Sequence, residues 1–369
     1  MLERYGHGGD LQTAAEMYGK PASGFLDFSS NMNPFGPPES VGRVLAAYAS
    51  VIGSYPDPAS RKLRRKLARL HDIDEQSILI GNGAAELIDL VVRWLRPSVT
   101  GLACPSFGEY GDAVRKIGGE VAPIMLRAEQ SFQLDEEALQ QSFAAGADFF
   151  LLGSPNNPTG RRIDPAIVRT LLNRGADVAL DEAFIDFIPD ADHYSFIREA
   201  AKSDKLFVIR SMTKFYAVPG IRLGYIVGSP ERIAALKQLQ VPWSVNSLAQ
   251  SIGEAVLDEH AYAEKTLNWL QEERSRLASR LDGLGFRVFP SETNYVLAQL
   301  PPGQGVTASA LQRAMGKKGV LIRDASHFTG LDESYCRFAV KLRHDNDTLC
   351  ETLSACLAEL SDPAGREVY

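Results

Sequence analysis

The sequence predicts an α/β fold in which helices cover a mostly parallel sheet and a smaller α+β domain follows. Between residues 77 and 229, short apolar runs alternate with helix-like stretches. Continuous apolar runs of this kind are typical of strands that are buried on both faces of a sheet. After residue 230 the pattern changes to long helices, with further strand candidates later in the chain. These observations predict a large sheet domain and a second, smaller domain.

The strands of the large sheet are expected where the apolar runs lie, at residues 77–81, 101–105, 149–153, 178–181, 206–210 and 224–228. Leucines at helical spacing predict a long helix over residues 261–283. The strands of the smaller domain are expected at residues 286–290, 294–299, 319–323 and 335–342. The domain organisation that we expect is an N-terminal arm and part of the small domain over 1–40, a large cofactor-binding domain over 41–245 and a small C-terminal domain over 246–369.

Composition and charge argue against several classes of protein. The 369 residues are 45% hydrophobic and 23% charged, which is typical of a sizeable globular enzyme. No run approaches the roughly 18 uncharged apolar residues of a membrane span, and the first residues lack the apolar core of a signal peptide, so we expect a cytoplasmic protein without a membrane partner. A net charge of −7 argues against a general nucleic-acid binder. The four scattered cysteines show no metal-ligand spacing, and no metal is expected.

One segment, residues 61–70, is strongly basic. Its leucines at 63, 67 and 70 fall at helical spacing. We interpret it as an amphipathic helix with a solvated basic face in preference to a site for a polyanion.

The residues that follow the predicted strands are polar, and ligands of open α/β sheets bind at these strand ends. After the first strand, residues 81–85 (Gly-Asn-Gly-Ala-Ala) form a glycine-rich turn that opens a helix. Free N–H groups at a helix start favour an anion such as phosphate, although a simple strand-to-helix connection has the same pattern. After the third strand, two prolines and a glycine in residues 154–160 (Ser-Pro-Asn-Asn-Pro-Thr-Gly) hold the Asn157 amide in place.

The next two strands end in charged groups. Asp181 ends a buried run, where a carboxylate needs a cation or a strong donor, unless it caps a helix. Lys214 lies among apolar residues, and burial lowers a lysine pKa toward the neutral amine that forms a Schiff base. Arg222, with the hydroxyls of Ser211 and Thr213, can complete a phosphate site. Taken together with Asn157, these groups suit one ligand with a phosphate, a phenolic oxygen, an aldehyde and a pyridine nitrogen, which is pyridoxal 5'-phosphate.

From about residue 25 onward, the chain resembles the fold-type I pyridoxal phosphate enzymes of the class I/II aminotransferase superfamily. The resemblance rests on residues 154–160 and on Ser211-Met212-Thr213-Lys214 with Arg222. It implies an aspartate-aminotransferase-like fold with a mostly parallel seven-stranded sheet. It also implies a homodimer with active sites at the subunit interface, and a role for each residue that matches the family's motifs.

In the cofactor site that this resemblance implies, Lys214 forms the Schiff base, Asp181 pairs with the pyridine nitrogen and Asn157 bonds the phenolic oxygen. Phe107 stacks on the ring. The residues that the resemblance assigns to the phosphate are Ala84, Ala85, Ser211, Thr213 and Arg222, with Tyr55 donated to the neighbouring subunit's cofactor. Phe184 stands where many members have a tyrosine, so the phenol hydrogen bond to the cofactor oxygen is missing.

Within the superfamily, the chain is most similar to the threonine-phosphate decarboxylases and next to the histidinol-phosphate aminotransferases. The segments that carry this similarity are residues 5–10 (Tyr-Gly-His-Gly-Gly-Asp), 27–36 and 181–187. The glycine-rich start is equally compatible with a flexible tail. The substrate-binding residues implied by the similarity are His7, Gly8, Asn31, Asn157, Arg323 and Arg337.

The expected reaction is decarboxylation of L-threonine O-3-phosphate to (R)-1-amino-2-propanol O-2-phosphate for cobalamin biosynthesis. A histidinol-phosphate-type aminotransferase and a decarboxylase of L-serine O-phosphate remain alternatives, because the same groups serve either reaction and a pocket discriminates one methyl group by only about 1–3 kcal/mol. A cofactor-binding regulator without turnover is a more distant third.

Overall fold

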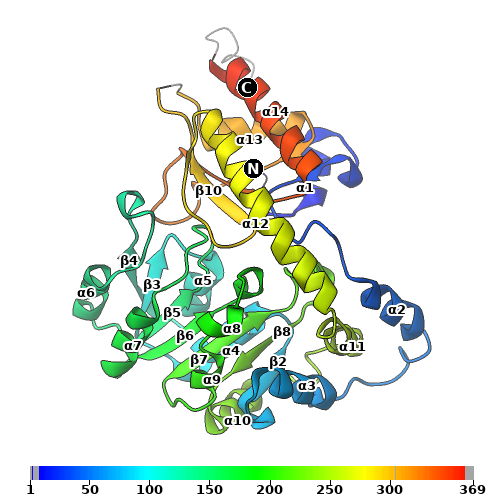
Figure 1. Cartoon of the computed structure of the whole chain (residues 1–369). Coiled ribbons are helices and arrows are strands. Elements are labelled where there is room, and N and C mark those ends of the chain that lie inside the picture. The colour runs from blue at the N-terminus through cyan, green and yellow to red at the C-terminus, as the bar shows by residue number, and fades with distance from the viewer. Residues whose placement is uncertain (1, 3–7, 304, 362–369) are drawn as a thin grey trace.

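A computed structural model describes residue 2 and residues 8–303 and 305–361 (Figure 1). His7, which the resemblance to the decarboxylases assigns to the substrate site, lies outside the described residues. Among the described helices, none combines the length and the apolar character that crossing a membrane demands.

A seven-stranded sheet forms the larger part of the molecule, and its strand order is β2-β8-β7-β6-β5-β3-β4. Only β8 runs antiparallel to its neighbours, so the predicted mostly parallel sheet is confirmed. The strands are β2 (Ile78–Gly81), β3 (Val99–Cys104), β4 (Glu120–Met125), β5 (Phe149–Gly153), β6 (Asp177–Asp181), β7 (Leu206–Ser211) and β8 (Gly224–Val227).

The α-helices of the larger part cover the sheet, as Figure 1 shows. They include α3 (Arg61–His71), α4 (Ala84–Leu95), α5 (Gly108–Lys116), α6 (Glu136–Ala144), α7 (Pro165–Asn173), α8 (Ala191–Tyr194), α9 (Ile197–Ala200) and α10 (Pro230–Leu239). The basic helix predicted near residues 61–70 is therefore present, and Leu63 and Leu67 are buried on its apolar face.

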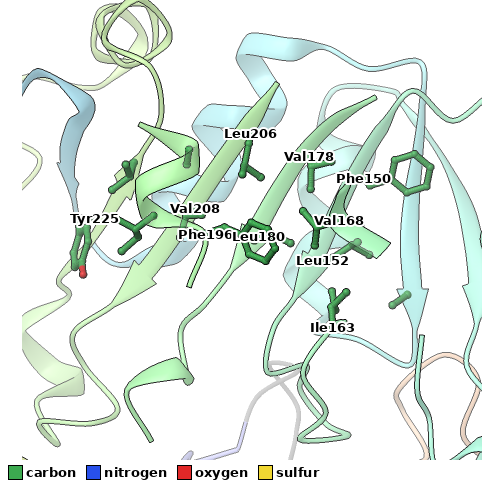
Figure 2. Packing of buried hydrophobic residues seen from close by; sticks show 14 of the residues in the cluster. Phe150, Leu152, Ile163, Val168, Val178, Leu180, Phe196, Leu206, Val208 and Tyr225 are labelled. Carbon is green, nitrogen blue, oxygen red and sulfur yellow. The ribbon is translucent and has the colours of Figure 1, made fainter. Parts of the chain in front are cut away.

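Apolar side chains from both faces of the central strands make this part of the core. Figure 2 shows Leu152, Leu180 and Val208 on neighbouring strands, with Val168 of α7 and Phe196, the residue before α9, packed against them. The central strands β5 and β7 are buried at every position, whereas the edge strand β4 alternates between exposed and buried residues. Burial on both faces explains why the central strands carry uninterrupted apolar runs.

The second part is a smaller α+β unit. Its antiparallel sheet has the order β12-β13-β10-β9, and β1 (Leu26–Asp27) pairs in parallel with β11 (Val320–Leu321). The remaining strands are β9 (Arg287–Val288), β10 (Tyr295–Gln299), β12 (Arg323–Asp324) and β13 (Tyr335–Ala339). The helices of this part and of the connections to it are α1 (Leu11–Tyr18), α2 (Glu39–Tyr48), α11 (Ser247–Val256), α12 (His260–Gly283), α13 (Ala308–Lys317) and α14 (Arg343–Ser361).

The long helix α12 runs from the larger part to the smaller one (Figure 1). Helix α11 contributes Ala249, Ile252 and Val256 to the same apolar cluster as the large sheet. The predicted domain boundaries at residues 40 and 245 stay a prediction.

Candidate active site

A cleft of about 340 Å³ lies where the carboxyl ends of the large sheet face the small unit. Residues from widely separated segments of the chain line the cleft. They are Gly8, Ser29, Ser30, Asn31, Met32, Ser106, Phe107, Gly108, Asn157, Phe184, Lys214, Arg323, His327, Phe328, Thr329 and Arg337. The fold thus brings segments from Gly8 to Arg337 to the edge of the sheet where ligands of α/β proteins bind.

Lys214 lines this cleft. Its Nζ donates to Ser211 Oγ at 3.0 Å, and Ser211 Oγ lies 2.9 Å from Thr213 Oγ1. Burial lowers the pKa of Lys214, the negative charge of Asp181 opposes this shift, and the positive charge of Arg222 reinforces it. The lowered pKa, as the sequence predicts, increases the fraction of neutral amine at position 214.

The start of helix α4, with the Arg222 guanidinium across it, is a candidate anion cradle. Gly83 caps the helix with φ of 84°, a conformation that side chains rarely adopt. A Cβ atom at Gly83 would lie 2.6 Å from Arg222 Nη2, so the guanidinium lies across the space that the glycine leaves open. Free N–H groups, the positive end of the helix dipole and this guanidinium all favour a phosphate group here.

Asp181 is held by two hydrogen bonds. Tyr110 Oη donates to its Oδ2 at 2.8 Å, and the Ala183 amide donates to its Oδ1 at 3.0 Å. Burial raises the pKa of Asp181, while the Lys214 charge and both hydrogen bonds lower it. A buried carboxylate of this kind can stabilise a cation brought by a ligand. Sequence reasoning missed Tyr110.

Asn157 contacts the small unit through its side chain. Arg337 Nη1 donates to Asn157 Oδ1 at 2.5 Å, and Arg337 Nη2 donates to the Ser29 carbonyl at 2.6 Å. The neighbouring Asn156 fixes the turn, because its Nδ2 donates to the Pro105 carbonyl and to Thr159 Oγ1. Asn157 therefore projects from a rigid turn, in agreement with the expectation from residues 154–160.

Two arginines lie on the small-unit side of the cleft. Arg323 and Arg337 are directly opposite each other across the β12–β13 pair, and both are about 5% exposed. Adjacent like charges raise the local positive potential, which favours an anionic ligand between them. His327 and Thr329, which sequence reasoning missed, line the same side of the cleft.

A buried ion-pair network lies behind the ends of β6 and β7. Arg210 donates to Glu182 Oε2 at 2.9 Å and to Asp186 Oδ1 at 2.7 Å, and its Nη2 donates to Ser195 Oγ at 3.0 Å. Glu182 follows Asp181 directly in the chain. The network therefore fixes the turn that carries Asp181 and Phe184.

The N-terminal segment closes one side of the cleft at Gly8 and Gly9. A Cβ atom at Gly8 would lie 2.2 Å from the Ser29 carbonyl oxygen, so this approach requires glycine. The Gly9 amide donates to Ser29 Oγ at 2.8 Å, and Ser29 Oγ in turn donates to Asp27 Oδ1. The described part of the arm thus lies against the Ser29 turn.

The structure brings most of the predicted site residues together. Those that line the cleft or lie next to Lys214 and Arg222 are Gly8, Asn31, Ala84, Phe107, Asn157, Asp181, Ser211, Thr213, Arg323 and Arg337. Ala85 follows Ala84 in the first turn of α4. Tyr55 is different, because it is 85% exposed, does not line the cleft and contacts Trp243 at a ring-centroid distance of 5.3 Å. The roles of all these residues stay predictions.

The fold and the site define an α/β protein with a lysine, a buried aspartate and an arginine beside a helix start at the carboxyl ends of a mostly parallel sheet. The chain belongs to the family described as aminotransferase class I and II, which matches residues 23–353.

Individual relatives cover nearly the whole chain. Threonine-phosphate decarboxylase of Salmonella typhimurium is 36% identical over 96% of this chain and 97% of its own length. The crystal structure of L-threonine-O-3-phosphate decarboxylase from Porphyromonas gingivalis has a TM-score of 0.78 and 29% identity, and it covers 90% of this chain and 99% of that one. Histidinol-phosphate aminotransferase from Clostridium acetobutylicum has a TM-score of 0.83 and 33% identity with the same coverage. Both reaction types are thus represented among proteins of the same fold.

Proposed function

We propose that this chain is a pyridoxal phosphate enzyme that decarboxylates L-threonine O-3-phosphate to (R)-1-amino-2-propanol O-2-phosphate, a step of cobalamin biosynthesis. The observation that carries the proposal is the 36% identity with the Salmonella typhimurium enzyme of that name over nearly the full length of both chains. The site supports it with two opposed, buried arginines beside a lysine of lowered pKa.

The residues present fit pyridoxal phosphate. The open space at Gly83, the overlying Arg222 and the start of α4 suit its phosphate, with Ser211 and Thr213 beside them. Lys214 is the amine that would join its aldehyde. Phe107 would stack on the ring, Asp181 would pair with the ring nitrogen, and Asn157 would bond the phenolic oxygen. When bound, the cofactor withdraws the electron pair left behind when a bond at the substrate Cα breaks.

The chain's own residues would do the remaining work. Asp181 is a buried carboxylate that would keep a proton on the ring nitrogen. Arg323 and Arg337 would bind the phosphate and the carboxylate of the substrate, with Asn31 and the arm residue Gly8 closing the cleft. The Lys214 amine would return a proton to Cα after carbon dioxide leaves.

The choice between decarboxylation and transamination would depend on how the residues of the cleft hold the substrate. In an aminotransferase, Arg337 would hold the carboxylate so that the Cα–H bond breaks. For decarboxylation, the arginines and the arm would anchor the phosphate and leave the bond between Cα and the carboxylate to break. Asn157 already accepts from Arg337, so the position of this guanidinium is coupled to the cofactor side of the cleft.

The experiment uses the purified protein with pyridoxal phosphate and each of three substrates, L-threonine O-3-phosphate, L-serine O-phosphate and histidinol phosphate. Carbon dioxide and the amine product are measured without any keto acid, and a parallel series with 2-oxoglutarate measures transamination. The proposal expects carbon dioxide release from threonine phosphate and less from serine phosphate. Turnover of histidinol phosphate that requires 2-oxoglutarate, without carbon dioxide from either amino acid, would support the aminotransferase instead.

We further propose a homodimer in which Tyr55 of one subunit approaches the cofactor phosphate of the other. Tyr55 and Trp243 form an exposed aromatic pair, and Ile52 and Val241 nearby in sequence are 66% and 68% exposed. Apolar side chains exposed in this way are typical of surfaces that become buried in an assembly. Analytical ultracentrifugation should give a dimer, and Tyr55→Ala should weaken cofactor binding while leaving the Gly83 cradle intact.

A further inference from the structure

We propose that Tyr110 is a positioning residue that holds Asp181 ionised and aimed at the cofactor's ring nitrogen, so that the ring keeps its proton during turnover. The inference rests on the proposed function and deepens it by assigning a role to a residue outside the cleft lining.

The contact itself is short and buried. Tyr110 Oη donates to Asp181 Oδ2 at 2.8 Å, and the two residues are 2% and 6% exposed. A donor directed at a carboxylate favours its ionised form, and the effect is strong where water is excluded. The Ala183 amide occupies the other oxygen, so both oxygens of the carboxylate are oriented by the protein.

The local fold is arranged to allow this contact. Asp181 at the end of β6 is the register partner of Gly153 at the end of β5. A Cβ atom at Gly153 would lie 3.1 Å from Tyr110 Oη, so the glycine leaves room for the phenol to reach across the strand end. Tyr110 lies in the first turn of α5 and packs edge-on against Phe107 at a centroid distance of 5.6 Å. One helix start therefore supplies the proposed stacking ring and the donor to Asp181.

The charged and titratable groups around the carboxylate determine in which direction the loss of the Tyr110 hydroxyl shifts the pKa of Asp181. Lys214 and Tyr110 lower the pKa of Asp181 against the effect of burial, and Tyr295 is a further phenol close to this pair. Burial and the neighbouring Asp181 charge raise the pKa of Tyr110, so the phenol stays protonated and serves as a donor. Removal of its hydroxyl would make the carboxylate more basic and would move the shared proton from the ring nitrogen toward Asp181.

The test compares Tyr110→Phe with Tyr225→Phe, both reconstituted with cofactor labelled with ¹⁵N in the ring. Tyr225 is a matched control, because it is also a buried phenol but bonds His71 Nε2 at 2.8 Å. The ring-nitrogen chemical shift of the bound cofactor reports protonation before substrate is added. We expect it to move toward neutral pyridine in Tyr110→Phe and to stay at the wild-type position in Tyr225→Phe.

With substrate, kcat of Tyr110→Phe should fall about 10-fold or more, the effect expected for a lost hydrogen bond to a charged group. KM should change by less than about 2-fold, because the arginines that bind substrate are untouched. An unchanged ring-nitrogen shift in Tyr110→Phe would overturn this inference and leave the proposed function standing. A wild-type protein that takes up no cofactor would overturn both.

Discussion

Substitution of Gly83 by alanine tests the anion cradle at the start of α4. The residue has φ of 84° and ψ of 166°, a region that is essentially restricted to glycine. The new Cβ atom would lie 2.6 Å from Arg222 Nη2, so the guanidinium must move. The backbone strain and the displacement of the guanidinium can be measured separately. The strain is present with and without cofactor, whereas the displaced guanidinium affects cofactor binding.

The strain should lower the free energy of unfolding of the apoprotein by about 1–3 kcal/mol. Loss of the contact between Arg222 and the phosphate should weaken cofactor binding by about 1.5–3 kcal/mol, which corresponds to a rise in Kd of about 10- to 150-fold. Denaturant unfolding measures the first quantity, and titration of the apoprotein with pyridoxal phosphate measures the second.

Gly220→Ala is the matched control for this experiment. Gly220 lies two residues before Arg222, and a Cβ atom there would have no neighbour within 4 Å. We expect its cofactor Kd to stay at the wild-type value. A Gly83→Ala protein with wild-type affinity for the cofactor would refute the assignment of this turn and Arg222 to the phosphate.

Two further predictions concern buried ionisable groups, the guanidinium of Arg210 and the imidazole of His71. Arg210→Leu should lower the free energy of unfolding by about 3–5 kcal/mol, because the buried carboxylates of Glu182 and Asp186 lose their cation. Denaturant unfolding measures this quantity, and a change below about 1 kcal/mol would contradict the prediction. Burial lowers the pKa of His71 to about 3, with the charges of Arg210 and Arg198 adding to the shift. Between pH 6.5 and about pH 3, His71 binds a proton in the unfolded chain but not in the folded chain. The free energy of unfolding therefore falls as the pH is lowered. When the pH is lowered from 6.5 to 4.5, the free energy of unfolding of the wild type should fall by about 2 kcal/mol more than that of His71→Gln, as measured by unfolding at each pH. Parallel pH profiles of the two proteins would argue against the lowered pKa of His71.

The sequence predicted the central strands and the site residues that follow them. Strands β5 and β7 are buried on both faces, so their apolar runs stand out in the sequence. Lys214 and Asp181 could be found for the same reason, because each lies at or just after such a run. Because parallel strands place their carboxyl ends at the same edge of the sheet, the sequence alone also predicts that these residues lie close together.

Edge and split strands were harder to predict. The edge strand β4 alternates between buried and exposed residues and contains Pro123, so it has no continuous apolar run. The single strand expected at residues 319–323 is divided, because Val320–Leu321 pairs with β1 whereas Arg323–Asp324 pairs with β13. Such a division depends on partners that are remote in sequence.

The missed site residues depend on long-range contacts of the same kind. Tyr110 and Asp181 are 71 positions apart in the chain, and no residue next to Tyr110 in sequence indicates that its hydroxyl contacts a carboxylate. Its spacing of three from Phe107 is the one available signal, because residues three apart face the same side of a helix. His327 lies in the connection between β12 and β13, where a lone histidine gives no pattern.

The proposed function requires that Lys214 joins pyridoxal phosphate covalently in the resting protein. The most direct measurement is borohydride reduction of the cofactor-loaded protein, followed by mass mapping of its proteolytic peptides. We expect a pyridoxyl group on Lys214 and none in a Lys214→Ala protein. A pyridoxyl group on another lysine, or a Lys214→Ala protein that turns over at the wild-type rate, would contradict it.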